Sequence, residues 1–155
     1  MIKHENGGVQ HYEIVNPESH SVSVVAFDDQ GRVILVEMYR FGHDRRLREL
    51  PAGTAESGET FLQAIRRELL EETGYGGEIS EIGSHLIAAE HGVTRHVFVA
   101  NECRKVSEPH PEQSEIDEGI RVLTVPLEEF KEIVRSGQIT ETGAAFMALD
   151  HLGLL

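Results

Sequence analysis

The sequence predicts an α+β fold in which helices pack on the faces of a mixed β-sheet. Three observations support this prediction. Strand-like runs outnumber helical ones, the apolar periodicity changes near residue 60, and the order is strands, one helix, strands, then helices. The chain has 155 residues, 39% of them hydrophobic and 26% charged, as in an ordinary globular domain. We therefore expect a single domain over residues 1–155, with residues 1–18 as an N-terminal extension.

The first elements are expected to be strands. A short apolar alternation at residues 12–15 predicts an early strand, which Asn16-Pro17 would end. The β-rich runs 21–27 and 32–39 flank residues 28–31, a pattern typical of a hairpin. A polar, arginine-rich stretch and a glycine-punctuated loop then lead to Glu59.

The next element is predicted to be a helix, which begins near Thr60. Thr60 or Ser57 could cap its first turn, and Gly74 is a typical helix-ending residue. The apolar residues that recur at helical spacing are Phe61, Leu62, Ile65 and Leu69.

The second half alternates again between strands and helices. Residues 79–89, 96–100 and 120–125 are predicted strands. Pro126 opens an amphipathic helical segment at residues 127–137, and residues 142–151 are expected to form a closing helix.

Charge and composition narrow the classes of partner. The chain has 14 basic and 27 acidic residues and a formal net charge of -13, which weighs against DNA or RNA as a partner. A phosphate ligand would therefore need placed arginines or a divalent cation. The sequence has no long apolar run and no signal-like start, so we expect a cytoplasmic protein that does not contact membranes. Cys103, the single cysteine, is expected to be a strand thiol rather than a nucleophile.

Three glutamates on the predicted helix are the main candidates for chemistry. Glu68, Glu71 and Glu72 fall at i, i+3 and i+4, so their side chains share one patch at the edge of the apolar stripe. Like charges at this spacing repel one another. Either the side chains turn to water and pair with bases such as Arg66 or Arg67, or they share hard divalent cations, for which Mg²⁺ is the natural choice.

The residues around these glutamates resemble the Nudix box. Gly53 is followed after five residues by Glu59, and after seven more by Arg67-Glu68-Leu69-x-Glu71-Glu72-x-Gly74-Tyr75. Only Tyr75 departs from the pattern, because the family prefers an aliphatic residue there. The resemblance implies an α/β/α sandwich with a catalytic helix packed on a mixed sheet, and a hydrolase that uses Mg²⁺, with Mn²⁺ as the alternative.

The resemblance also assigns roles to residues of the box. It implies that Glu68, Glu71 and Glu72 are metal ligands, together with the carbonyl of Gly53 or Ala52. Glu71 and Glu72 would also be catalytic, and Arg67 would orient Glu59 or one of the box carboxylates by paired hydrogen bonds.

Two flanking segments are similar to the ADP-ribose and nucleoside-diphosphate-sugar pyrophosphatase branch of that family. In VEMYRFG and RELPAG, Arg40 and Glu49 match residues that lie near the substrate in that branch. The alternatives are a solvated Arg40 and a surface Glu49 paired with Arg48. His91 stands where ADP-ribose members carry a proline, which weighs against ADP-ribose itself.

The roles of His91 and of a general base are less well defined by the sequence. His91 and His96 are candidate substrate contacts, with ordinary surface histidines as the alternative. By resemblance, a glutamate on a late loop would take a proton from the attacking water. Glu118 is the first choice, followed by Glu115 and Glu112, and a box glutamate is a further alternative. The competing interpretation is a solvated acidic loop.

The leading hypothesis is a magnesium-dependent hydrolase that cleaves the diphosphate linkage of a small nucleoside diphosphate derivative, such as ADP-ribose or a nucleotide sugar. The alternatives within the same class are a (deoxy)nucleoside triphosphate or dinucleoside polyphosphate pyrophosphohydrolase. An alternative of another class is a non-catalytic, nucleotide-sensing module. The resemblance also implies a homodimer built partly through the N-terminal strands.

Overall fold

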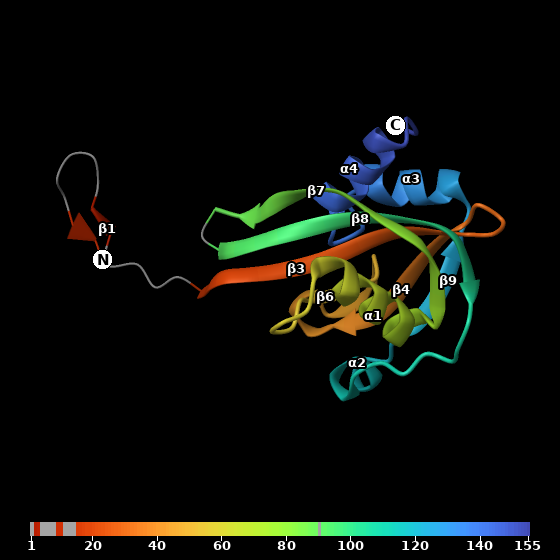
Figure 1. Ribbon diagram of the computed structural model, residues 1–155, viewed down its shortest axis with the longest axis horizontal. Coiled ribbons are helices and arrows are strands. Elements are labelled where there is room, and N and C mark those ends of the chain that lie inside the picture. Colours follow the sequence, from red (N-terminus) through yellow and green to blue (C-terminus); the bar gives the residue numbers. More distant parts are fainter. Residues whose placement is uncertain (1, 4–8, 11–14, 90) are drawn as a thin grey trace.

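A seven-stranded mixed sheet is the centre of the computed structural model, which describes residues 2–3, 9–10, 15–89 and 91–155 (Figure 1). Its strands are β3 (Val15–Asp28), β4 (Val33–Arg40), β5 (Arg45–Glu49), β6 (Ala52–Thr54), β7 (Tyr75–Ala88), β8 (His91–Lys105) and β9 (Arg121–Val125). The main strand order is β5-β4-β3-β8-β7, with β6 paired to β3 and β9 paired to β4. β3 and β8 are parallel, whereas the other pairs are antiparallel. The predicted mixed sheet is confirmed.

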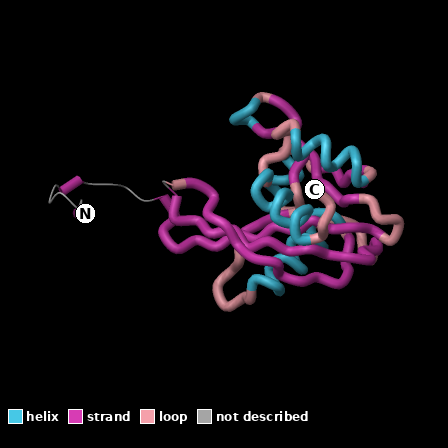
Figure 2. Tube along the Cα trace, turned by 90° about the horizontal axis from the view of Figure 1, so that it is seen from above, coloured by secondary structure: helices cyan, strands magenta, loops and turns pink. Residues whose placement is uncertain are grey.

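Helices cover both faces of this sheet. The helices of the chain are η1 (Phe41–His43), α1 (Phe61–Thr73), α2 (Gln113–Asp117), α3 (Leu127–Arg135) and α4 (Thr142–His151). α1 packs on one face, and α3 and α4 pack on the other. Beyond the helices, β3, β8 and β7 continue side by side at one end (Figures 1 and 2). A separate antiparallel pair is formed by β1 (Ile2–Lys3) and β2 (Val9–Gln10).

Alternation along the strands produces two cores. In β3, Val22, Val24 and Ala26 face α1, whereas Val25 and Phe27 face α3 and α4. Because successive side chains of a strand point to opposite faces, a central strand covered on both sides needs consecutive apolar residues, which β3 has at residues 24–27. The length of the run in β3 therefore reflects its place in the middle of the sheet.

The predicted helix α1 begins and ends as expected. Of the two candidate caps, Thr60 is the one that the structure uses: its Oγ1 accepts from Gln63 N at 3.1 Å, and Gln63 Oε1 accepts from Thr60 N at 2.9 Å. This reciprocal pair satisfies two backbone donors that the helix itself leaves unpaired. Gly74 ends the helix with a left-handed φ of 74°. The predicted helices at α3 and α4 and the β3–β4 hairpin are also confirmed.

Some elements differ from the prediction. The arginine-rich stretch contains β5, the loop before α1 contains β6, and the late acidic loop contains α2. β7 and β8 begin earlier than expected. Of the strand expected at residues 12–15, only Val15, the first residue of β3, falls within the described residues. Cys103 lies buried in β8, as predicted for a strand thiol. In the part of the chain that the structure describes, no helix is long and apolar enough to cross a membrane.

Candidate active site

Helix α1 and strand β6 place Glu68 against Gly53. A Cβ atom added at Gly53 would lie 2.0 Å from Glu68 Cδ and 2.0 Å from its Oε1. Glycine is needed here because the carboxylate occupies the space that any side chain would take. The resemblance implied a backbone ligand from Gly53 or Ala52, and the structure adds a steric reason for glycine at residue 53.

Arg67 connects the carboxylates of the box. Its Nε and Nη2 donate to the two oxygens of Glu59 at 3.0 and 3.1 Å, and Nη1 donates to Glu68 at 2.9 Å and to Glu71 at 3.3 Å. Nη2 also donates to the Thr54 carbonyl at 3.2 Å. The pairing lowers the pKa of Glu59, chiefly through the hydrogen bonds from Arg67. Arg67 therefore fixes the loop before α1 relative to the carboxylates on α1.

The carboxylates of Glu68 and Glu72 are costly to ionise in this environment. Burial raises the pKa of Glu68 to about 7, with Glu71 and Glu115 adding to the effect and Arg67 opposing it. Glu72 is only 3% exposed, and burial raises its pKa well above the ordinary value, reinforced by Glu115 and Glu68. The Ala52 amide donates to Glu72 at 3.4 Å and opposes this shift. Such a buried acidic group favours a cation among its members.

The three candidate bases lie on or beside the short helix α2. Glu115 lies close enough to Glu72 to raise the pKa of that carboxyl. Its Oε2 also accepts from Glu112 N at 2.8 Å, which closes the start of α2. Glu118, which follows α2, instead accepts from Arg40 Nη1 at 2.8 Å. Glu115 is thus the candidate that lies next to the box carboxylates.

Arg40 and Glu49 form a bidentate pair. Arg40 Nε and Nη2 each donate to a Glu49 oxygen at 2.6 Å. Glu49 is 5% exposed, so the alternative of a surface glutamate paired with Arg48 is wrong. Arg48 pairs with Glu129 at 3.0 Å instead. Arg40 is not a freely solvated strand-end arginine either, because three of its nitrogens are bound to carboxylates.

Two adjacent cavities bring these groups together. One has a volume of about 330 Å³, and its lining includes Arg40, Glu49, Glu72, Glu115 and Glu118. The other, of about 530 Å³, is lined by the loop before α1 and by Arg67 and Glu68. Ala52, Gly53, Thr54, Glu112 and Glu115 line both. The predicted base candidates, the Arg40–Glu49 pair and the box therefore share one region.

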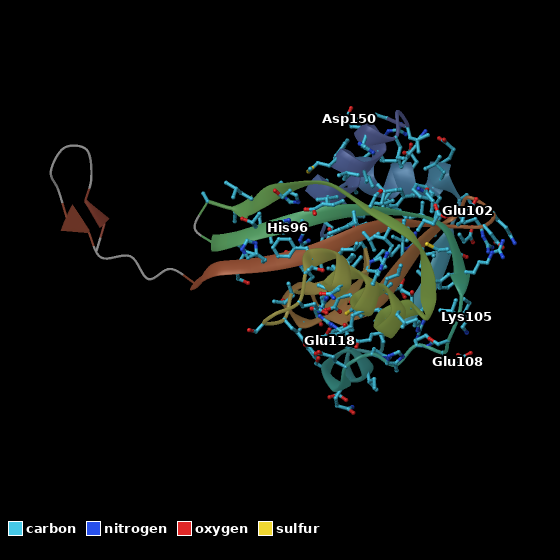
Figure 3. All side chains as sticks on the ribbon, viewed as in Figure 1. His96, Glu102, Lys105, Glu108, Glu118 and Asp150 are labelled. Atoms are coloured by element: carbon cyan, nitrogen blue, oxygen red, sulfur yellow. The ribbon has the colours of Figure 1, made fainter. Side chains whose placement is uncertain are left out.

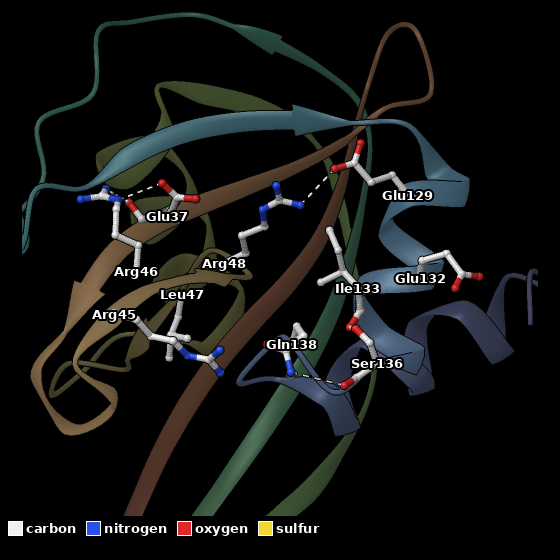
Figure 4. Close-up of a pocket in the computed structure, with 10 residues that line it drawn as sticks. All are labelled: Glu37, Arg45, Arg46, Leu47, Arg48, Glu129, Glu132, Ile133, Ser136 and Gln138. Atoms are coloured by element: carbon white, nitrogen blue, oxygen red, sulfur yellow. Dashed lines mark hydrogen bonds and ion pairs between the residues drawn. The ribbon is translucent and has the colours of Figure 1, made fainter.

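A further cavity of about 440 Å³ lies between β5 and α3 (Figure 4). Arginines of β5 and glutamates of α3 line it, among them the ion pair of Arg48 and Glu129. None of the predicted site residues lines this cavity.

Of the two candidate histidines, the structure describes only the side chain of His96. His91 is the first residue of β8, and its side chain lies outside the described part of the structure. His96 lies on β8 away from Glu118 (Figure 3) and lines neither of the two site cavities. It contacts His20 at 3.1 Å and Glu81 at 2.9 Å, and it stacks on Phe61 with ring centroids 3.6 Å apart.

Two charged residues that were not predicted, Arg95 and Glu141, also line the 330 Å³ cavity. Arg95 reaches the cavity because β8 runs parallel to β3, with Arg95 opposite Ser21. Glu141 reaches it as the residue before α4. Arg95 lies between Thr94 and His96, just before the predicted strand at residues 96–100, and this local sequence does not reveal which strand lies beside it.

The donor set suits a hard cation. Carboxylate oxygens of Glu68, Glu71 and Glu72 and the carbonyls of β6 are the ligands that Mg²⁺ prefers. Over the described residues no three acidic, histidine or cysteine side chains converge on one point. Glu68 and Glu71 turn to Arg67, whereas Glu72 turns to the Ala52 amide. The residues fit such an ion by their chemistry and by their location beside β6.

Comparison with known proteins gives consistent matches. A sequence model described as the NUDIX domain matches residues 18–143. The ADP-ribose pyrophosphatase of Bacillus subtilis is 33% identical over 153 residues, which cover 96% of this chain and 80% of that protein. The GDP-mannose pyrophosphatase of Cronobacter sakazakii is 30% identical over 155 residues, covering 94% and 80%. A solved structure titled as an ADP compounds hydrolase has a TM-score of 0.77 at 21% identity and covers 97% of this chain and 84% of that one. This last likeness concerns the fold.

Proposed function

The chain belongs to the NUDIX family, and from this premise we propose that it is a divalent-metal-dependent hydrolase that cleaves the diphosphate linkage of a nucleoside diphosphate derivative. The names of its relatives support this bond type. The observation that carries the proposal is the buried carboxylate group of α1, which opens on the two cavities beside Gly53. The protein is expected to act in the cytoplasm on small molecules rather than on nucleic acids.

Glu68, Glu71 and Glu72 would hold the metal, together with the carbonyl of Gly53 or Ala52. Mg²⁺ is the first choice and Mn²⁺ the second. When bound, the metal would neutralise the diphosphate and supply an activated water. Arg67 keeps Glu59 and the box carboxylates in place through the hydrogen bonds described above, so it acts by positioning.

We propose Glu115 as the proton acceptor, with Glu118 second. This order reverses the one expected from the sequence, in which Glu118 is the first choice. Glu115 lies beside Glu72 and lines both cavities, whereas Glu118 is held by Arg40 at 2.8 Å. A base must be within reach of the reacting water, and Glu115 meets this condition better. Substitution E115Q should therefore lower kcat more than E118Q does, and the opposite ranking would return the role to Glu118.

Arg40 and Glu49 would contact the substrate from the wall of the 330 Å³ cavity. ADP-ribose and nucleotide sugars are the substrate classes that we propose, with His91 as a further contact at the position where ADP-ribose members carry proline. Triphosphates and dinucleoside polyphosphates are the alternatives. We also expect a homodimer, partly through the N-terminal strands.

A substrate panel tests the proposal. It should contain ADP-ribose, GDP-mannose, a diadenosine polyphosphate and a nucleoside triphosphate, each with Mg²⁺ and with a chelator. The expected result is metal-dependent release of a nucleoside monophosphate from a diphosphate derivative. Binding of a nucleotide without any product would favour the sensing module instead.

A further inference from the structure

A second arginine–glutamate pair lies on the wall of the same 330 Å³ cavity. Arg95 Nε donates to Ser21 Oγ at 3.1 Å, and Arg95 Nη1 lies 3.4 Å from Glu141 Oε1. Glu141 is 6% exposed and accepts from the Leu50 amide at 3.1 Å and from the Thr140 hydroxyl at 2.7 Å. The pair is therefore anchored to β3 and to the loop that leads to the box.

The donors of Arg95 are much less occupied than those of the other arginines at the site. All three nitrogens of Arg40 donate to carboxylates, and all three of Arg67 donate to carboxylates or a carbonyl. Among the described residues, Arg95 donates a single hydrogen bond, although a guanidinium has five N–H donors. Its side chain is 18% exposed and lines the cavity.

Apart from Arg40, whose three nitrogens are already paired with Glu49 and Glu118, the other charged residues that line this cavity are acidic. Glu49, Glu72, Glu115 and Glu118 all contribute to it. An anionic substrate therefore needs a cation here in addition to any metal at the box. A guanidinium is well suited, because its planar fork binds two phosphate oxygens at once.

We propose that Arg95 binds a phosphate of the substrate and that Glu141 is its positioning residue, an inference that rests on the proposed function. Ser21 accepts from Arg95 Nε and Glu141 lies beside Nη1, which leaves the other N–H donors of the guanidinium for the ligand. Burial is the largest influence on the pKa of Glu141 and raises it, whereas Arg95 opposes the shift.

The test compares R95A and R95K with R104A, a matched control on the same strand whose side chain is 73% exposed. With ADP-ribose and GDP-mannose as substrates, R95A should raise KM roughly 10- to 100-fold, the effect of one charge-assisted hydrogen bond, while kcat changes much less. R95K should recover part of the loss, because it keeps the charge without the fork. R104A should match the wild type.

A binding measurement separates this role from a structural one. The affinity for α,β-methylene-ADP, measured by calorimetry, should fall in R95A and less in E141Q, at unchanged thermal stability. If R95A does not fold, the same comparison is made with R95K and E141Q, in which KM should rise while kcat changes much less. Wild-type KM and affinity in R95A, or in both R95K and E141Q where R95A does not fold, would overturn the role of Arg95. Inactivity of the wild type on every diphosphate would instead overturn the proposed function.

Discussion

Substitution of Gly53 by alanine should disrupt catalysis while leaving the fold nearly intact. The added Cβ would lie 2.0 Å from Glu68 Cδ and 2.6 Å from its Oε2, where ordinary contact begins at 3.4 Å. Gly53 does not have a left-handed backbone conformation, so alanine creates no backbone strain. The conflict is confined to the end of a flexible side chain, and the Glu68 carboxylate must move.

The magnitude follows from that displacement. A shift of about 1 Å in a catalytic group can cost on the order of 100-fold in rate, so kcat should fall by that factor. The free energy of unfolding should change by about 1 kcal/mol or less, because no buried group is removed.

The assay is metal-dependent hydrolysis of ADP-ribose or GDP-mannose, combined with urea denaturation of each variant. Gly42→Ala is the control, since a Cβ there meets no atom within 4 Å. Wild-type kcat in G53A would refute the steric account. So would a loss of activity that merely follows a loss of folded protein.

Three further predictions concern the same helix. R67A should lower kcat/KM at least 100-fold and reduce the free energy of unfolding by about 1–3 kcal/mol, because charged hydrogen bonds are lost. Steady-state kinetics and urea denaturation measure the two effects, and wild-type values in both would contradict this prediction. With a chelator present, the stability that Glu68 contributes is fully present below its ordinary pKa of 4.5 and is lost as the pH rises through about 7, because its pKa in the folded protein is raised. E68Q should therefore flatten the plot of melting temperature against pH in that range, and an unchanged slope would exclude Glu68 as its source. G74A should reduce the free energy of unfolding by about 2 kcal/mol or more, since its Cβ would meet a backbone carbonyl at 2.2 Å. The control G137A should cost about 1 kcal/mol, because Gly137 also has a left-handed backbone but no atom within 4 Å of an added Cβ; equal losses would show that the contact does not matter.

Much of the architecture follows from apolar periodicity. The hairpin of β3 and β4 and the helices α1 and α3 have clear patterns, and the structure contains them together with the predicted closing helix α4. Strand β5 was missed because Leu47 is its only apolar residue. Its other inward residue is the buried Glu49, whose burial depends on a partner, Arg40, that lies on another strand.

In the site, too, contacts within one helix are predictable from the sequence, whereas contacts between distant segments are not. The spacing of Glu68, Glu71 and Glu72 places them together on one helix, as fixed helical geometry requires. The proximity of Glu115 to Glu72 and the register that sets Arg95 beside Ser21 depend on how distant segments pack. These contacts are properties of the tertiary structure, and local patterns do not encode them.

The most direct test of the central claim is the turnover of E72Q. Glu72 is 3% exposed, and glutamine preserves its shape while removing the charge that would bind a metal. In the presence of Mg²⁺, the wild type should release a nucleoside monophosphate from ADP-ribose or GDP-mannose. E72Q should remain folded and lose activity by about 1,000-fold or more, a loss of roughly 4 kcal/mol in transition-state stabilisation. Equal turnover by folded E72Q would contradict the assignment of the α1 carboxylates as the catalytic centre.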